Sequence, residues 1–261
     1  FQQHCNRIIM IRTPVILIFD VGKTNKKLLL FNQQYEIVFE ESIQLNETVD
    51  EDGFACENII SLSNWILENY KKYINSTAFD VRAINFSAYG ASVVLIDEKG
   101  APCFPLYNYL KPFPVALQHS LYEKYGGEEF FCLETASPSL GSLNSGLQLY
   151  RLMVEKNIEF EKAQCALHLP QYLSYLLTNK AATDITSIGC HTSLWDFQHN
   201  QYHRWAHQEG IADKFAPIYK SDDVVYVQND TIAIGSGLHD SSSALIPYLK
   251  TIKEPFLLIS T

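Results

Sequence analysis

The chain opens with a continuous run of β-branched and aromatic residues at positions 14–19. A run without polar alternation is typical of a strand that is buried on both faces. After a polar turn at 21–25, apolar residues return at 28–31, and a second turn at 32–34 leads into a third apolar stretch at 35–39. Three short runs joined by tight turns predict an antiparallel β-meander at the start of the chain.

Helical periodicity follows the meander. Ile59, Leu62, Ile66 and Tyr70 recur at intervals of three or four residues, which predicts a helix over about 57–73. Later segments alternate between the two patterns, and no repeat or low-complexity linker divides them, so we expect one α/β domain. The further predicted elements are strands at 81–86, 93–96 and 231–234, and helices at 116–125, 145–155 and 171–177.

Composition narrows the class of protein. The 261 residues are 47% hydrophobic and 19% charged, as in an ordinary globular chain. The net charge of −9 has no basic stripe to offset it, which argues against nucleic acid or an anionic membrane as a partner. No apolar run approaches the roughly 20 residues of a membrane helix. Six cysteines without a CxxC pair, and no export signal, predict reduced, buried thiols and a cytoplasmic location.

The first candidate site is the turn after the opening strand. Asp20 ends the strand, and Gly-Lys-Thr-Asn follows at 22–25. Such a turn presents N–H groups and a lysine to phosphate oxygens, with the carboxylate placed for a metal ion. It is not a Walker A loop, because GxxxxGK[ST] requires glycine at position 17, where Leu17 stands. The same residue types also suit an ordinary hairpin turn.

The second candidate site lies near the end of the chain, where the run 231–234 leads into Gly-Ser-Gly-Leu and then His239 and Asp240. A carboxylate at the carboxyl end of a strand is placed to act as a base toward a substrate hydroxyl. Alternatively, Asp240 caps the helix that follows. A Ser-His-Asp triad from His239, Asp240 and Ser241 is disfavoured, because adjacent side chains rarely converge in that geometry and no GxSxG elbow exists.

Two further groups of residues have open interpretations. Cys190 and His191 are adjacent and could suggest zinc, but no second pair has metal-ligand spacing, which favours a polar core or pocket-wall role. Four aromatic residues could stack on a sugar face, although aromatic residues are more often part of a core or pocket rim. These are Tyr107, Tyr109, Phe113 and Trp195.

Taken together, the two loops resemble a known family. Asp-x-Gly-x-Thr-Asn at 20–25 and Gly-x-Gly-x-His-Asp-Ser-x-x-Ala at 235–244 look like motifs of the FGGY carbohydrate kinases, in the actin/hexokinase/Hsp70 superfamily. The landmarks at 86–90, 144–149 and 183–186 fall in the same order. The His-Asp form is most similar to the deoxyketose kinases acting on L-rhamnulose or L-fuculose. The resemblance implies an α/β, actin-like/ribonuclease H-like ATPase fold, with a mixed sheet that opens in an antiparallel β-meander and is flanked by helices.

The resemblance also implies residue roles and cofactors. Asp240 matches the catalytic base, and Asp20 matches a catalytic carboxylate near Mg2+ and the transferring phosphate of ATP. Ser92 stands where some relatives carry Asp, which leaves the sugar open. The phosphate-binding turn corresponds to Gly22, Lys23, Thr24 and Asn25, and the sugar contacts to His239, Tyr89, Gly90, Ser92, Asn144 and Gln148.

Relatives in this family are about twice as long as this chain and have two domains. We therefore expect a sugar-binding domain at 14–254, the first strand of a nucleotide-binding domain at 255–261, and an extraneous tail at 1–13 with Met10 as the natural start. The implied partners are a sugar and, through a C-terminal domain absent here, ATP. An isolated half would expose its cleft surface, which predicts self-association, with a homodimer as one candidate. The alternative is a non-catalytic sugar-binding or regulatory domain.

Overall fold

The computed structural model describes residues 12–257, and a three-stranded antiparallel meander opens its central sheet. The strands are β1 (Thr13–Val21), β2 (Lys26–Phe31) and β3 (Ile37–Ile43). The predicted meander is confirmed, but the third strand begins later than position 35. The reason is that the side chain of Asn32 accepts the backbone N–H groups of Gln34 and Glu36, at 2.9 Å each, and so prolongs the turn.

Parallel strands complete the sheet on the other side of β1. Strand β6 (Phe79–Ala88) runs parallel to β1, and β14 (Ile232–Gly235) and β15 (Leu238–His239) run parallel to β6. The edge strand β13 (Val224–Gln228) is antiparallel to β14, so the order is β13-β14-β6-β1-β2-β3, with β15 continuing beside β6. The sheet is therefore mixed, as expected, and the carboxyl ends of β1, β6 and β15 meet at one edge.

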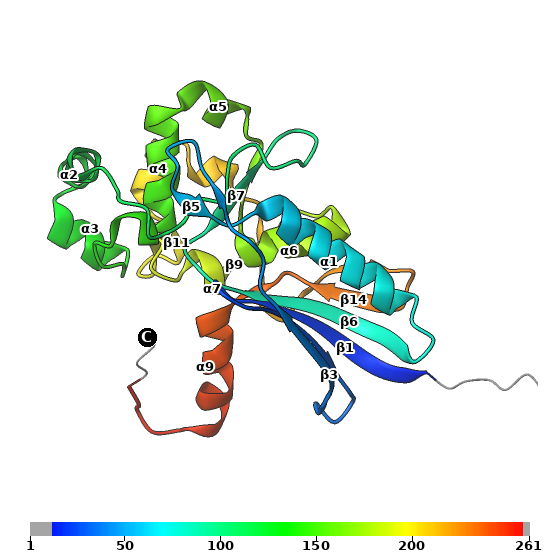
Figure 1. The fold of residues 1–261 in the computed structure, drawn as a ribbon. Helices are drawn as coiled ribbons and strands as arrows, with labels where there is room; N and C mark the ends of the chain where they lie inside the picture. Colours follow the sequence, from blue (N-terminus) through cyan, green and yellow to red (C-terminus); the bar gives the residue numbers. More distant parts are fainter. Residues whose placement is uncertain (1–11, 258–261) are drawn as a thin grey trace, which may run out of the picture.

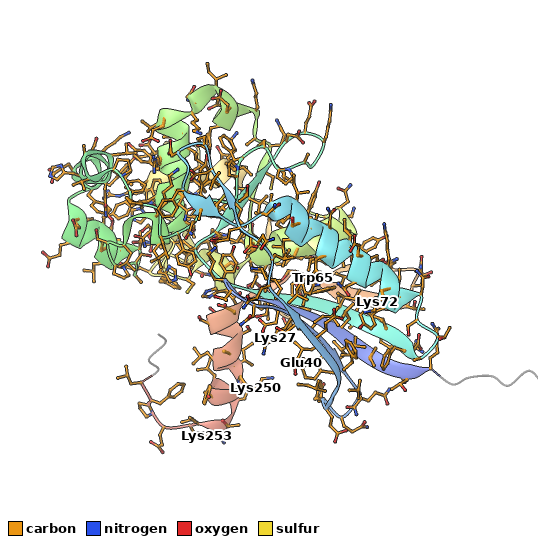
Figure 2. All side chains as sticks on the ribbon, in the orientation of Figure 1. Lys27, Glu40, Trp65, Lys72, Lys250 and Lys253 are labelled. Carbon is orange, nitrogen blue, oxygen red and sulfur yellow. The ribbon has the colours of Figure 1, made fainter. Side chains whose placement is uncertain are left out.

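Two helices, α1 (Ile59–Ile74) and α6 (Leu169–Thr178), pack on one face of this sheet (Figure 1). Helix α1 begins where the side chain of Asn58 accepts the N–H of Ser61 at 3.0 Å. The ring of Trp65 in this helix meets the ring of Phe19 edge-on, with the ring centroids 5.5 Å apart. The ring of Phe19 in turn stacks on that of Phe86 in β6, with the centroids 5.6 Å apart. Figure 2 shows Trp65 on the sheet side of α1. The apolar stripe of the helix therefore covers the most buried strands.

A second hydrophobic cluster lies among the helices of the middle of the chain, around the fully buried Trp205. Its helices are α2 (Val115–Lys124), α3 (Glu128–Glu134), α4 (Ser145–Glu155), α5 (Asn157–Lys162) and α8 (Arg204–Gln208). The predicted strand at 93–96 is β7 (Val93–Ile96), which pairs with β8 (Cys165–His168) outside the main sheet. Several elements of two to four residues are too short to show a hydrophobic period, so the sequence did not predict them. They are α7 (Ile185–Ile188), η1 (Gly141–Leu143), η2 (Ala212–Lys214), β4 (Thr48–Val49), β5 (Ala55–Cys56), β9 (Thr183–Asp184), β10 (Trp195–Asp196), β11 (Gln201–Tyr202) and β12 (Ile218–Tyr219).

Helix α9 (Asp240–Thr251) projects from the edge of the sheet and buries none of its residues (Figure 1). Lys250 lies in its last turn and Lys253 lies two residues beyond its end, while Lys27 and Glu40 form a surface ion pair at 3.5 Å between β2 and β3 (Figure 2). Pro255, Phe256 and Leu257 are not part of a strand, and positions 258–261 lie outside the described residues. α9 thus ends in an irregular segment where the next strand was expected.

The structure bears on three further expectations, which concern the N-terminal tail, the cysteines and membrane-spanning helices. Thr13 already belongs to β1, whereas positions 1–11, with Met10, lie outside the described residues. Every described cysteine is free of a disulfide, yet only Cys56 is buried and Cys103 is exposed, so buried thiols are not the rule. Among the described residues, no helix has the length and apolar character needed to cross a membrane.

Candidate functional site

Two acidic residues from opposite ends of the chain meet at the carboxyl edge of the sheet. Strand register places Asp20 of β1 opposite Ser87 of β6, and Leu238 of β15 is opposite Ser87 from the other side. Asp20 and Asp240 consequently line one cleft of about 740 Å³. Burial raises the pKa of Asp20, the Ser87 hydroxyl lowers it, and the negative charge of Asp240 raises it further, so that the net shift is upward.

Asp240 is held at the first turn of α9. One carboxylate oxygen, Oδ1, accepts the N–H of Ser241 at 2.6 Å and lies 3.4 Å from Nε2 of His239. Within residues 12–257 no hydrogen bond reaches the other oxygen, Oδ2. The helix-cap interpretation of Asp240 is wrong, because His239 is the N-cap of α9 and no side chain makes a capping hydrogen bond there. Asp240 is the first residue of the helix and lines the cleft.

His239 is fixed by the short helix α7, which the sequence pattern did not predict. The backbone N–H of His239 donates to Oγ1 of Thr186 at 3.0 Å, and that hydroxyl in turn donates to the buried carboxylate of Asp184. The ring Nδ1 lies 3.0 Å from the hydroxyl of Ser242. Burial lowers the pKa of His239, the charge of Asp240 raises it, and His191 lowers it, with a net downward shift. The landmark at 183–186 thus acts by positioning the His-Asp loop.

Two glycines of the motifs lie where a side chain would collide with a neighbouring segment. Gly237 has φ +85°, and a Cβ there would lie 2.3 Å from the carbonyl oxygen of Pro170 in α6. At Gly90 a Cβ would lie 2.4 Å from Nε2 of His239. The His-Asp loop can therefore approach both α6 and the end of β6 only because these positions lack side chains.

The turn at 22–25 connects β1 to β2 at the cleft. The N–H of Gly22 donates to the carbonyl of Asn25 at 3.0 Å, as in a hairpin, and Gly22 lines the cleft beside Asp20. Lys23 pairs with Glu47 and lines the adjoining part of the cleft. Thr24 and Asn25 are exposed, and the side chain of Asn25 accepts a hydrogen bond from Gln44 at 3.0 Å. The turn thus has hairpin geometry and also places Gly22 and Lys23 at the cleft.

The cleft continues past Asp240 into a second hollow of about 540 Å³, within the size range of small-molecule sites. Three of the predicted sugar contacts, His239, Tyr89 and Gly90, line it. Cys190 and His191 form part of its wall, which agrees with the pocket-wall interpretation, and of the four aromatic candidates only Tyr109 is among the lining residues. Ala91 and Leu143 also line it, and nothing in the local sequence singled them out.

Three predicted sugar contacts lie elsewhere. The side chain of Ser92 is buried, with 1% of its surface exposed. Asn144 is fully buried and uses its amide twice, donating to the carbonyl of His191 at 2.7 Å and accepting the N–H of Leu140 at 2.9 Å. Gln148 donates to the carbonyl of Ala91 at 2.7 Å and faces a separate cavity.

The side-chain amides of Asn144 and Gln148 both support the backbone in the wall of the second hollow. Ala91 and His191 have φ of +57° and +43°, a backbone conformation that costs free energy for residues other than glycine. Each of these residues has its carbonyl held by one of the two amides. In this structure Asn144 and Gln148 stabilise the wall of the hollow, and neither lines it.

Comparisons with known proteins agree with the motifs. The model of the FGGY family of carbohydrate kinases, N-terminal domain, matches residues 15–245, and the chain belongs to this family. A rhamnulokinase of Halalkalibacterium halodurans is 24% identical over 69% of this chain and 39% of its own length. An L-fuculokinase of Escherichia coli is 24% identical over 73% of this chain and 40% of its own length.

Solved structures show the same fold. A carbohydrate kinase from Novosphingobium aromaticivorans is 26% identical, with a TM-score of 0.79 over 90% of this chain and 51% of that one. A ligand-bound xylulose kinase from Lactobacillus acidophilus is 18% identical, with a TM-score of 0.72 over 89% of this chain and 49% of that one. The chain thus spans about half the length of these structures and about two fifths of the curated relatives.

Proposed function

We propose that this chain is the sugar-binding part of an ATP-dependent carbohydrate kinase in which Asp240 is the general base. The observation that carries the proposal is the convergence of Asp240, Asp20 and Gly22 on one cleft, which continues into a hollow of small-molecule size that Lys23 lines. Membership of the FGGY family supports it. The names of the curated relatives, rhamnulokinase and L-fuculokinase, favour a ketose or deoxyketose as the sugar.

In this proposal the chain positions groups and neutralises charge, which is most of what phosphoryl transfer requires. The free Oδ2 of Asp240 accepts the proton of the sugar hydroxyl as the oxygen attacks the γ-phosphate. A positioned base of this kind typically contributes about 10²–10⁴-fold to a rate. Ser241 and His239 contact Oδ1, so that among residues 12–257 the second oxygen has no hydrogen bond to give up before it binds the substrate hydroxyl.

The carboxylate of Asp20 and the hydroxyl of Ser87 fit a magnesium ion, because Mg2+ binds hard oxygen ligands. The upward pKa shift of Asp20, caused by burial and by Asp240, supports this assignment, since a cation there would offset the repulsion between the two carboxylates. Bound Mg2+ would neutralise charge on the phosphate oxygens. Gly22, Lys23, Thr24 and Asn25 would bind phosphate oxygens.

ATP would reach this cleft from a part of the protein that corresponds to the unmatched half of the relatives. The apolar side chains of Ile18, Leu29, Phe31 and Tyr248 lie in the cleft with Asp20 and Asp240, and such a second domain would cover them. Without it we expect the exposed surface to promote self-association, with a homodimer as the candidate form.

A second candidate is a sugar-binding or regulatory module of the same fold without chemistry. The carboxylates of Asp20 and Asp240 argue against this candidate, because a protein that only binds sugar needs neither a general base nor a carboxylate placed for a metal ion. The two candidates make different predictions about the product of the full reading frame.

The experiment measures sugar binding and ATP-dependent phosphorylation by that full-length product, over a panel of ketoses and deoxyketoses. We expect Asp240→Asn to bind sugar with near-normal affinity and to lose phosphorylation by at least about 10²-fold. The matched control is Asp222→Asn, a change of the same kind at an exposed position. Normal turnover by Asp240→Asn would refute the base, and sugar binding without any phosphorylation by the unaltered protein would establish the module.

A further inference from the structure

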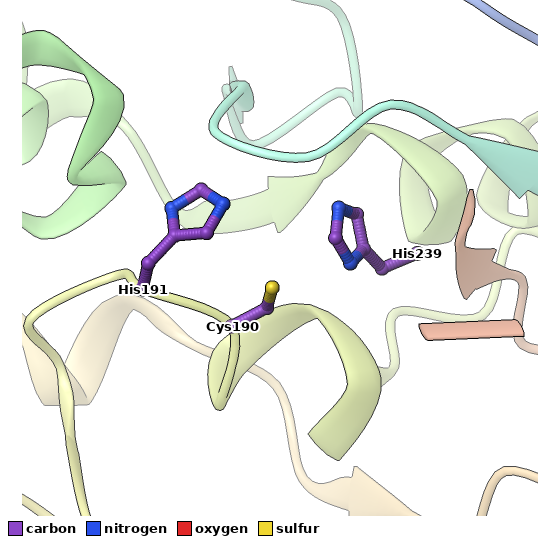
Figure 3. Close-up of side chains that lie close together, drawn as sticks. All are labelled: Cys190, His191 and His239. Atoms are coloured by element: carbon purple, nitrogen blue, oxygen red, sulfur yellow. The ribbon is translucent and has the colours of Figure 1, made fainter. Parts of the chain in front are cut away.

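Three metal-type side chains from two distant segments converge in the wall of the hollow. One donor atom each of Cys190, His191 and His239 lies within 4.8 Å of the others. Figure 3 shows the two imidazole rings on either side, with the sulfur of Cys190 directed toward the space between them. All three residues line the hollow next to Asp240, so that a ligand on them would be reached from the cleft.

The backbone conformation explains how the adjacent residues Cys190 and His191 can both face the same point. Side chains of consecutive residues in an extended chain point to opposite sides. His191, however, has φ +43°, and this left-handed conformation turns the chain so that its ring and the Cys190 thiol lie on the same side. The amide of Asn144 holds the carbonyl of His191 at 2.7 Å and so maintains the turn.

The hydrogen bonds of His191 prepare it as a ligand. Its Nδ1 lies 3.2 Å from the carbonyl oxygen of Leu143, which can only accept, so Nδ1 carries the proton. The lone pair is then on Nε2, the nitrogen on the far side of the ring. A backbone carbonyl that fixes the other ring nitrogen is the usual outer partner of a metal-bound histidine.

We propose that Cys190, His191 and His239 form a zinc site inside the cleft, with a fourth position open to the hollow. One thiolate and two imidazoles are ligands typical of Zn2+, and three protein ligands with an open position are typical of an accessible zinc site. Zn–S and Zn–N distances of about 2.3 and 2.0–2.1 Å place tetrahedral ligands roughly 3.3–3.7 Å apart. The present spacing of at most 4.8 Å exceeds that value by roughly 1.1–1.5 Å, which side-chain rotation of Cys190 and His191 would close around a fixed His239.

The zinc site excludes the sugar. The metal would occupy the hollow that His239 and Gly90 share with Asp240, and its open position would take up water or a hydroxyl there. Zinc therefore acts as an inhibitor that competes with the sugar, and this part of the inference rests on the proposed function. The binding of zinc itself does not depend on the proposed function.

The test uses cobalt as a spectroscopic probe for zinc. The protein is titrated with Co2+, and absorption from the thiolate-to-cobalt transition and from tetrahedral cobalt is recorded, followed by displacement with Zn2+. We expect one Co2+ per chain with a thiolate signal, and binding at least about 10-fold weaker in Cys190→Ser and in His191→Gln. Adding a sugar that the protein binds should weaken Co2+ binding in proportion to its occupancy.

Matched controls are Cys103→Ser, which alters an exposed thiol, and His119→Gln, which alters an exposed imidazole. Both should bind Co2+ as the unaltered protein does. Circular dichroism verifies that each variant is folded, and the two ligand variants are independent of each other. Absence of a thiolate signal, or equal Co2+ affinity in both ligand variants and the unaltered protein, would overturn the zinc site whether or not the protein phosphorylates a sugar.

Discussion

Gly90 and His239 approach each other so closely that a methyl group on Gly90 would lie 2.4 Å from Nε2 of the imidazole. The ring cannot easily move away, because the backbone N–H of His239 is bound to Thr186 and its Nδ1 lies beside Ser242. The end of β6 and the loop after β15 thus determine each other's position. This contact places Asp240 at the junction of the two parts of the cleft.

The first prediction concerns this contact. Gly90→Ala should lower the free energy of unfolding by about 1–3 kcal/mol, because an extra methyl group in a packed site forces its neighbours to shift. The measurement is urea denaturation of the variant and the unaltered protein. In a His239→Ala background the same change should cost much less, since the clashing ring is gone. An equal cost in both backgrounds would contradict the contact.

The second prediction concerns the hydroxyl of Thr186. Thr186→Val keeps the shape of the side chain but leaves the N–H of His239 and the carboxylate of Asp184 without their shared partner. We expect a loss of about 1–3 kcal/mol in the free energy of unfolding. Thr186→Ser should restore most of it, and Thr231→Val, at an exposed position, should change little. If valine and serine behave alike at 186, the hydroxyl has no positioning role.

The third prediction concerns a buried ion pair behind the turn at 22–25. Lys26 and Glu57 are 2.8 Å apart with both side chains 2% exposed, and Nζ of Lys26 also donates to the carbonyl of Lys23 at 3.0 Å. Lys26→Met should cost about 3–5 kcal/mol, because it leaves an uncompensated buried carboxylate. Adding Glu57→Gln should recover part of that loss, because the charge is then removed.

The exposed pair of Lys72 and Glu41 provides the control for this experiment. Their side chains are 58% and 38% exposed and lie 3.5 Å apart, so Lys72→Met should cost less than about 1 kcal/mol (Figure 2 labels Lys72). Thermal or urea unfolding measures both changes. Similar costs at Lys26 and Lys72 would show that burial does not strengthen the inner pair.

The fourth prediction is a pH dependence of stability. Complete burial, followed by the charges of His239 and His191, lowers the pKa of His168 to about 3, from an unfolded value near 6.5. A histidine with a lowered folded pKa stays neutral in the fold and takes up a proton on unfolding. Its contribution to stability is therefore complete above pH 6.5 and is lost as the pH falls toward 3.

Between pH 6.5 and 5 this loss amounts to about 2 kcal/mol. His168→Gln should remove that part of the pH dependence while keeping a polar partner for Ser145, whose hydroxyl lies 3.0 Å from Nε2. Urea denaturation at several pH values measures the slope. The control His119→Gln changes an exposed side chain and should leave the slope as it was, whereas an unchanged slope in His168→Gln would contradict the assignment.

Much of the fold could be predicted because its long elements carry strong periods. The apolar run of β1 and the helical spacing of Ile59, Leu62 and Ile66 were sufficient to predict the first strand and α1, although β1 is fully buried on one face only and not on both. Short elements such as α7 and β15 have only a few residues, too few for a period to show. They are formed by contacts with distant segments, such as the pairing of β15 with β6.

The sequence by itself determined the chemistry of the two loops: an acidic group and a glycine-lysine turn near one end, and a His-Asp pair after two glycines near the other. Their order, together with the intermediate landmarks, was specific enough for the family. The tertiary structure decided which side chains reach the cleft. It turned Asn144 and Gln148 into supports for strained backbone, and it brought Cys190 and His191 beside His239. The physical reason is that side-chain direction depends on backbone conformation and on packing partners far away in sequence, which a local pattern does not contain.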